Sequence, residues 1–162
     1  MKVALGTAQF GLDYGVLNHK GQITINEARN ILDLAESIGI DTLDTASGYG
    51  NSEQALGKVG VDNYQIITKT SSIKLGVDSV ISDFYKSLER LGLAQVEGLL
   101  IHNIDDIKSK QFDVLFSKLN QLKERGFVNK IGFSTYTPKH VDFLLENLDF
   151  DLIQLPLNVF DV

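Results

Sequence analysis

The sequence contains no cysteine, which excludes disulfide bonds, thiolate metal sites and thiol nucleophiles and fits a reducing compartment. Basic residues are outnumbered as well, with 15 Lys and Arg against 21 Asp and Glu and a net charge of −6. Nucleic acid is therefore not an expected partner, because phosphate binding needs a basic face. No apolar run approaches the roughly 20 residues that span a membrane, and no low-complexity stretch or linker interrupts the chain.

The remaining composition is that of an ordinary globular protein, 43% hydrophobic and 22% charged over 162 residues. We expect one domain covering residues 1–162, since this length is ample for a single core. The N-terminal segment is interrupted by Gly6 too soon for a signal peptide. These features lead us to expect a cytoplasmic protein that does not associate with membranes.

Short apolar runs alternate with amphipathic helical patterns along the chain. Strands are predicted over residues 3–5, 40–44, 64–68, 96–101, 130–133 and 152–155. A loop is predicted over residues 9–21, and a helix follows a capping-box pattern at residues 24–27. Ser52 is predicted to cap a short helix that Gly57 stops. Further helices are predicted over residues 77–91, 112–122 and 138–148, the last with Val141, Leu144, Leu145 and Leu148 facing inward.

Strand–helix alternation of this kind predicts a parallel sheet covered by helices. A doubly wound dinucleotide-binding sheet should carry G-x-G-x-x-G after its first strand, but residues 6–11 read G-T-A-Q-F-G, and no P-loop is present. The favoured fold is a (β/α)8 TIM barrel, whose site lies at the C-terminal ends of its strands. Because a complete barrel takes roughly 250 residues and eight strands, the six predicted β/α units indicate a partial barrel with the last two strands missing.

Polar side chains stand where the predicted strands end. They are Asp44 with Tyr49 just beyond it, Lys69, His102, Ser134 and Gln154. In a barrel these side chains would converge on one mouth. Each also has a structural alternative, such as a turn cap for the aspartate or an exposed strand-end charge for the lysine. The joint occurrence favours a site. The remaining histidines, His19 and His140, are given no site role.

These side chains suit the polarisation and protonation of a carbonyl group. Tyrosine is a poor acid with a reference pKa of about 10, and a neighbouring lysine is expected to lower that pKa. Asp44 would hold the lysine charged, and His102 could orient a carbonyl oxygen against Tyr49. None of these residues donates hydride, so a nicotinamide would have to supply it. Ser134 and Gln154 are suited to hydrogen-bonding a carboxamide such as that of nicotinamide.

A series of motifs extends across essentially the whole chain. They are D-T-A-x-x-Y-G at residues 44–50, S-E-x-x-L-G at 52–57, Lys69, L-L-I-H at 99–102, G-x-V-x-K-I-G-x-S at 126–134, and Gln154 with Asn158. In order and rough spacing these motifs resemble those of the aldo-keto reductases. The opening residues 6–15 resemble a bacterial branch associated with surface-sugar biosynthesis. The family usually has Ser-Asn after strand five, where this chain has Ser134-Thr135.

The resemblance implies a (β/α)8 barrel that reduces aldehydes or ketones with NADPH and without a metal. It implies Tyr49 as general acid, Lys69 and Asp44 as its tuning pair, and His102 as the residue that orients the carbonyl. Contacts to the cofactor are implied for Gly6, Thr7, Asp44, Ser134 and Gln154. The family segments that hold the pyrophosphate and the 2′-phosphate follow strands seven and eight, so activity of this chain is expected to be impaired.

Two function classes stay open at this point. One is the reductase, and the other is a non-catalytic partial barrel that acts as an assembly or binding module. A barrel isomerase or lyase that forms an imine at Lys69 is a third possibility, but it would leave Tyr49 and Gln154 without roles. Unpaired edges of the first and sixth strands favour association, so self-association through these edges is also expected.

Overall fold

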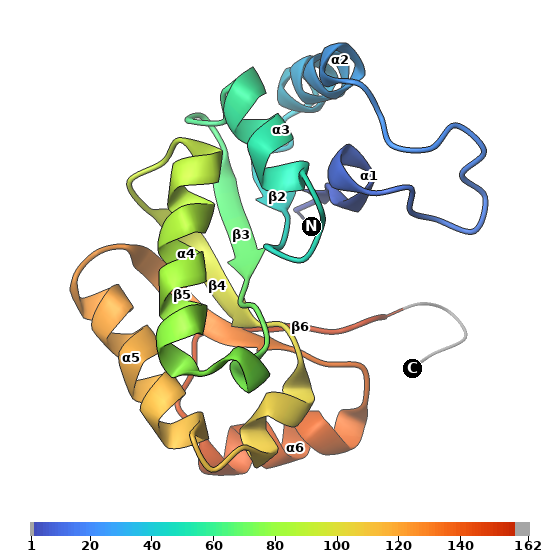
Figure 1. Cartoon of the computed structure of the whole chain (residues 1–162). Helices are drawn as coiled ribbons and strands as arrows, with labels where there is room; N and C mark the ends of the chain where they lie inside the picture. Colours follow the sequence, from blue (N-terminus) through green and yellow to red (C-terminus); the bar gives the residue numbers. More distant parts are fainter. Residues whose placement is uncertain (1, 158–162) are drawn as a thin grey trace.

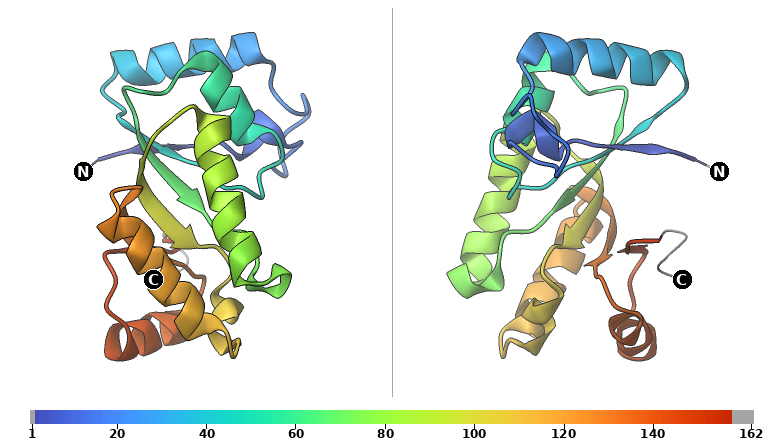
Figure 2. Two further views of the ribbon diagram at one scale, coloured as in Figure 1. Left: turned by 60° about the vertical axis from the view of Figure 1, so that its left-hand side comes forward. Right: turned by 90° about the vertical axis from the view of Figure 1, so that its right-hand side faces the viewer.

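The computed structural model describes residues 2–157, and Asn158 of the motif above lies outside them. One parallel sheet holds the six predicted strands in the order of the sequence. They are β1 (Ala4–Gly6), β2 (Thr42–Asp44), β3 (Gln65–Lys69), β4 (Val96–Ile101), β5 (Val128–Ser134) and β6 (Leu152–Gln154). A doubly wound sheet reverses its strand order partway, whereas this sheet curls in one direction as part of a barrel (Figures 1 and 2).

Helices connect successive strands and pack on the outer side of the curled sheet (Figure 2). They are α1 (Ala8–Gly11), α2 (Ile25–Ser37), α3 (Ser52–Val59), α4 (Val77–Leu91), α5 (Phe112–Glu124) and α6 (Pro138–Asn147), with short 3-10 turns η1 (Ile73–Leu75) and η2 (Ile104–Lys108). Neighbouring helices α2, α3, α4 and α5 contact one another in sequence. This layering confirms the predicted β/α architecture.

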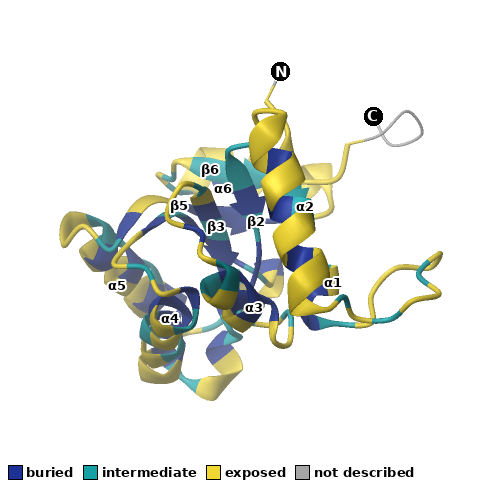
Figure 3. Ribbon diagram, turned by 90° about the horizontal axis from the view of Figure 1, so that it is seen from above, coloured by how far each residue is buried: buried dark blue, intermediate teal, exposed yellow. Residues whose placement is uncertain are grey.

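The main hydrophobic core lies between the strands and these helices (Figure 3). Leu43, Ile66 and Leu99 are fully buried on the central strands, and Leu56 and Leu115 meet them from the helices. Strand β4 is buried along nearly its whole length, while the edge strands β1 and β6 are only partly buried. The core therefore holds the central strands rigidly and fixes the positions of the side chains at their ends.

Several helices begin or end at the residues that the sequence predicts. Thr24 and Glu27 form the reciprocal capping box at the start of α2. Gly92 ends α4 in the left-handed conformation at φ +72°, and Pro138 occupies the first turn of α6.

Other sequence predictions at helices were wrong. The predicted loop over residues 9–21 begins inside α1, which has only four residues and so shows no helical periodicity. Asn51 rather than Ser52 precedes α3, and Ser52 is buried. Gly57 lies inside α3, which ends before Gly60. Leu145 of α6 is 67% exposed because only Leu144 in that turn faces the core.

Gly57 is required by a close approach of two helices. A methyl group at this position would collide with the main-chain carbonyl oxygen of Arg90 in α4. Gly57→Ala should lower the free energy of unfolding by about 1–3 kcal/mol through overpacking, although alanine favours a helix more than glycine does. Chemical denaturation checks this prediction. Gln54→Ala, an exposed change in the same helix, is the control, and equal stability of the two variants would contradict the prediction.

Candidate active site

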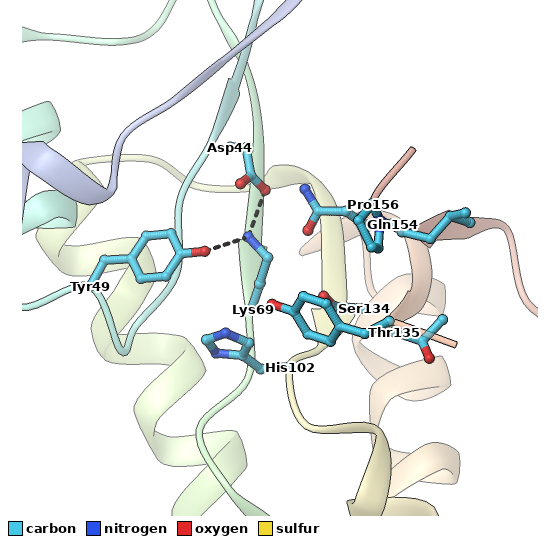
Figure 4. A pocket seen from close by; sticks show the side chains of 10 residues that line it. Asp44, Tyr49, Lys69, His102, Ser134, Thr135, Gln154 and Pro156 are labelled. Carbon is cyan, nitrogen blue, oxygen red and sulfur yellow. Dashed lines mark hydrogen bonds and ion pairs between the residues drawn. The ribbon is translucent and has the colours of Figure 1, made fainter. Parts of the chain in front are cut away.

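The parallel register carries the polar residues of neighbouring strands to one end of the sheet. Asp44 pairs with Gly6 on one side and Ile67 on the other, so Lys69 extends past Asp44 in the next strand. Ser134 and Gln154 are paired directly across β5 and β6. All six residues proposed at the strand ends line one cavity of about 250 Å³ (Figure 4): Asp44, Tyr49, Lys69, His102, Ser134 and Gln154.

Lys69 is the centre of this cluster and is only 3% exposed. Its Nζ donates to Asp44 Oδ1 at 2.6 Å and to the main-chain oxygen of Thr45 at 3.0 Å. It also lies 3.4 Å from the hydroxyl oxygen of Tyr49 (Figure 4). The short, charge-assisted bond to Asp44 and the bond to the Thr45 oxygen hold the ammonium group in place. The predicted Asp44, Lys69 and Tyr49 group is therefore a connected hydrogen-bonded chain.

The loop that carries Tyr49 is held by backbone contacts. Tyr49 donates its N–H to Ala46, and its carbonyl accepts from Ser52. Gly50 has φ +56°, and a Cβ there would collide with the carbonyl oxygen of Gly11 in α1. A Cβ at Gly11 would in turn collide with the Tyr49 carbonyl oxygen. Two glycines thus allow α1 to press against the loop and aim the tyrosine into the cavity.

Burial raises the pKa of Tyr49 to about 12, and the negative charge of Asp44 acts in the same direction. The lowering of the Tyr49 pKa expected from Lys69 is not found, because burial and the negative charge of Asp44 both disfavour the phenolate. Burial also lowers the pKa of Lys69, and Asp44 opposes that change. Tyr49 is therefore a neutral hydroxyl at pH 7, with a proton to donate.

His102 follows β4 and meets the Tyr49 ring edge to face, with ring centroids 5.9 Å apart. Burial lowers its pKa below 6.5, and the positive charge of Lys69 lowers it further. The imidazole is consequently neutral at pH 7. A neutral imidazole can donate one hydrogen bond to a carbonyl oxygen.

We predict that NMR titration will place the His102 pKa below 6.5. Lys69→Met should raise that pKa, because the nearby positive charge is gone while most of the burial remains. Lys86→Met, an exposed change on α4, should leave it unaltered. An unchanged His102 pKa in the Lys69 variant would show that the two groups do not interact.

Ser134 and Gln154 face the same cavity from the sheet edge (Figure 4). Neither side chain has a hydrogen-bond partner among residues 2–157. Thr135, which stands where the family usually has Asn, lines this cavity too, and so does Tyr136, which the sequence did not single out. Thr135 Oγ1 lies 3.1 Å from His140 Nδ1, so a histidine given no role supports the cavity wall.

Gly6 and Thr7 line an adjoining cavity of about 590 Å³ that also includes Asp44, Tyr49 and His102. Thr7 is fully buried, and its hydroxyl donates to the Asp44 main-chain oxygen at 2.9 Å. Ser52 Oγ lies 3.0 Å from the same hydroxyl. Thr7 therefore ties β1 to β2 below the site, and its contact to a cofactor stays a prediction.

An ion pair between Glu53 and Arg90 lies beside β3, the strand that carries Lys69. Glu53 of α3 is 1% exposed and accepts from Thr68 Oγ1 at 2.7 Å and from Arg90 Nε at 2.8 Å. Thr68 immediately precedes Lys69 in β3. The pair connects α3, which follows the Tyr49 loop, with the strand that carries the lysine and with α4.

Within the described chain, no group of three or more His, Asp or Glu side chains is placed to hold a metal ion. None of the helices described between residues 2 and 157 has the length and apolarity needed to cross a membrane.

The sequence is similar to a known protein family and to several curated proteins. The model of the Aldo/keto reductase family matches residues 2–162. An aldo-keto reductase of Mycobacterium sp. (strain KMS) is 32% identical over 118 residues, which is 70% of this chain and 42% of that protein. The oxidoreductase sirO of Leptosphaeria maculans is 29% identical over 149 residues, covering 88% of this chain and 45% of that protein.

Solved structures show the same fold. A putative aldo-keto reductase from Pseudomonas aeruginosa superposes with a TM-score of 0.81 at 26% identity, covering 97% of this chain and 63% of that one. A Bombyx mori aldo-keto reductase in complex with NADP has a TM-score of 0.72 at 23% identity, over 96% of this chain and 54% of that one. The chain spans less than half the length of the curated relatives it matches.

Proposed function

This chain belongs to the Aldo/keto reductase family, and from that membership we propose that its site reduces an aldehyde or ketone to an alcohol with NADPH. The observation that carries the proposal is the buried Lys69, 2.6 Å from Asp44 and 3.4 Å from the Tyr49 hydroxyl. A purely structural remnant has no need for a buried lysine aimed at a protonated phenol. This favours the reductase over the non-catalytic binding module.

Tyr49 is proposed to act as the general acid. Its proton moves from Oη to the carbonyl oxygen of the substrate as negative charge develops there. Lys69, whose Nζ lies 3.4 Å away, stabilises the tyrosinate left behind, and Asp44 holds the ammonium group in place. With a pKa of about 12, the Tyr49 hydroxyl stays protonated until negative charge develops on the carbonyl oxygen.

His102 is proposed to orient the carbonyl oxygen. Its neutral ring can donate one hydrogen bond and packs against Tyr49. Tyr49 and His102 would then contact the same oxygen. The carbonyl carbon would face the part of the cavity next to β5 and β6.

The cavity fits a nicotinamide. Ser134 and Gln154 present a hydroxyl and a carboxamide group that have no hydrogen-bond partner among residues 2–157 and that line the cavity together with Lys69, and such groups can bind the carboxamide of a ligand. NADPH, when bound, supplies the hydride that reduces the carbonyl carbon. Asp44, Gly6 and Thr7 are the further residues proposed to contact it. We propose NADPH rather than NADH as the hydride donor.

Consumption of NADPH in the presence of propanal tests this function. We expect turnover that requires the aldehyde and that is faster with NADPH than with NADH. If fluorescence detects no saturable binding of either cofactor and no turnover occurs, the binding-module alternative is favoured.

We also propose that the chain self-associates through the edges of its sheet. The two edge strands of the described sheet, β1 and β6, offer unpaired backbone groups. Light scattering coupled to size-exclusion chromatography would show a dimer or larger assembly, and a monomer at all concentrations would contradict it.

A further inference from the structure

Three buried hydroxyl groups form a hydrogen-bonded chain beside the site. They belong to Thr7, which follows β1, to Thr45, which follows β2, and to Ser52, the first residue of α3, and each of the three residues is 0% exposed. Ser52 is the middle member, because its Oγ lies 3.1 Å from Thr45 Oγ1 and 3.0 Å from Thr7 Oγ1. The same Oγ is 2.9 Å from the main-chain oxygen of Thr7. Ser52 does not cap α3, so these contacts need another explanation.

The direction of each hydrogen bond follows from the single proton that a hydroxyl carries. The Thr7 hydroxyl donates its proton to the main-chain oxygen of Asp44 at 2.9 Å, so both oxygens of Thr7 that face Ser52 accept. The Ser52 proton therefore points to Thr7, and Thr45 supplies the proton between Thr45 and Ser52. The chain runs from Thr45 through Ser52 and Thr7 to Asp44, with an acceptor for every proton. Hydrogen bonds that follow one another in this way strengthen each other.

The two ends of this hydroxyl chain belong to the two residues that hold Lys69. The chain begins at the side chain of Thr45 and ends at the main-chain oxygen of Asp44. Lys69 Nζ donates to the carboxylate of Asp44 at 2.6 Å (Figure 4) and to the main-chain oxygen of Thr45 at 3.0 Å. A shift of residues 44 and 45 would therefore move the ammonium group, which lies 3.4 Å from the Tyr49 hydroxyl oxygen.

Ser52 also contacts the loop that carries Tyr49. Its backbone N–H donates to the main-chain oxygen of Tyr49 at 3.0 Å. Ser52 is thus bonded to the tyrosine loop through its main chain and to the residues that hold Lys69 through its side chain. It lines neither of the two cavities that include Tyr49. Any effect of Ser52 on the reaction must therefore pass through Lys69 and Tyr49.

We propose that Ser52 is a positioning residue, whose hydroxyl fixes residues 44 and 45 and so keeps the Lys69 ammonium group beside Tyr49 during proton transfer. This role rests on the proposed function, in which Lys69 stabilises the tyrosinate. Without the Ser52 hydroxyl, the proton of Thr45 has no acceptor, and the segment after β2 loses its side-chain link to Thr7. The distance between Nζ and the tyrosine oxygen is then no longer held.

Steady-state kinetics of Ser52→Ala with propanal and NADPH test this role. The kcat should fall about 10- to 100-fold, because small displacements of catalytic groups have effects of this size. The KM for NADPH should change little, since the residues proposed to bind the nicotinamide are untouched. Ser117→Ala, an exposed change on α5, is the matched control and should keep the wild-type kcat.

A second variant separates positioning from stability. Ser52→Ala strands the buried Thr45 hydroxyl and should be less stable in urea than wild type. Adding Thr45→Val removes that hydroxyl with little change of shape, so stability should recover. The kcat should stay low in this double variant, because the hydroxyl chain is still absent. A kcat that recovers together with stability would show that Ser52 has only a structural role.

Hydrogen exchange of the Lys69 ammonium group tests the role without turnover. In protein with isotope-labelled lysine, NMR should show these protons exchanging with water several-fold faster in Ser52→Ala and in the double variant than in wild type. Lys69→Met identifies the signal by its loss. Unchanged exchange in Ser52→Ala, or a wild-type kcat, would overturn the role of Ser52 while the reductase stands. Faster exchange in Ser52→Ala, when wild type does not reduce propanal, would overturn the reductase while the hydroxyl chain still holds Lys69.

Discussion

Replacing Tyr49 with phenylalanine should lower kcat for carbonyl reduction by about 10²- to 10⁴-fold, the usual contribution of a positioned general acid. The variant removes one oxygen, and that oxygen lies 3.4 Å from Lys69 Nζ. Phenylalanine keeps the edge-to-face packing against His102. Cofactor affinity should change little, since Ser134 and Gln154 are untouched. Initial rates and fluorescence titration of NADPH measure the two effects separately.

Tyr85→Phe is the matched control for this prediction. Tyr85 lies on α4, packs against Phe127 and accepts from Arg125, away from the cavity. That variant should retain wild-type kcat. Activity of Tyr49→Phe within a few-fold of wild type would show that another group donates the proton.

The second large effect is expected at Glu53. Glu53→Ala should lower the free energy of unfolding by about 3 kcal/mol, because it breaks a buried ion pair and strands its partner. The Thr68 hydroxyl would lose its acceptor, and the Arg90 guanidinium would lose its carboxylate at 2.8 Å while keeping its hydrogen bond to Ser87. Part of the loss is offset because the Arg90 side chain is 23% exposed and keeps its contact with Asp83. Urea denaturation followed by circular dichroism measures the change.

A companion substitution distinguishes the buried charge from helix effects. Glu89→Ala removes an exposed carboxylate from α4 and should leave stability nearly unchanged. If Glu53→Ala were as stable as Glu89→Ala, the Glu53–Arg90 pair would not hold α3, β3 and α4 together.

Much of the architecture could be predicted because parallel strands carry continuous apolar runs. The run that ends at Asp44 and the one that ends at His102 place their last residues at one edge of the sheet. Residues as distant in sequence as Asp44 and Gln154 accordingly line one cavity. The start of α2 at Thr24 could also be predicted, because its capping box depends only on residues within one turn.

Features that depend on a distant neighbour could not be predicted. Gly57 resembles a helix stop, but it is required by the carbonyl of Arg90 in another helix. The buried partner of Glu53 is also far away in sequence. Tyr49 was expected to be a stronger acid beside Lys69, but its pKa depends on how deeply the loop is buried. None of these three-dimensional environments is visible in local sequence.

One buried hydroxyl could not be predicted for the same reason. Ser71 has the sequence context of an ordinary loop residue, but its Oγ is buried without a partner among residues 2–157. The 3.1 Å contact between Thr135, a departure from the family pattern, and His140 likewise depends on how α6 packs and is not visible in the sequence.

The central claim is that hydride from NADPH reaches a carbonyl carbon at the Tyr49 site. The most direct measurement uses NADPH deuterated at the transferring carbon, an aldehyde and the purified protein, with the alcohol product analysed by mass spectrometry. We predict an alcohol with one deuterium on the former carbonyl carbon, formed by wild type and at least 100-fold more slowly by Tyr49→Phe. No alcohol, alcohol without deuterium, or equal formation by both proteins would contradict the account.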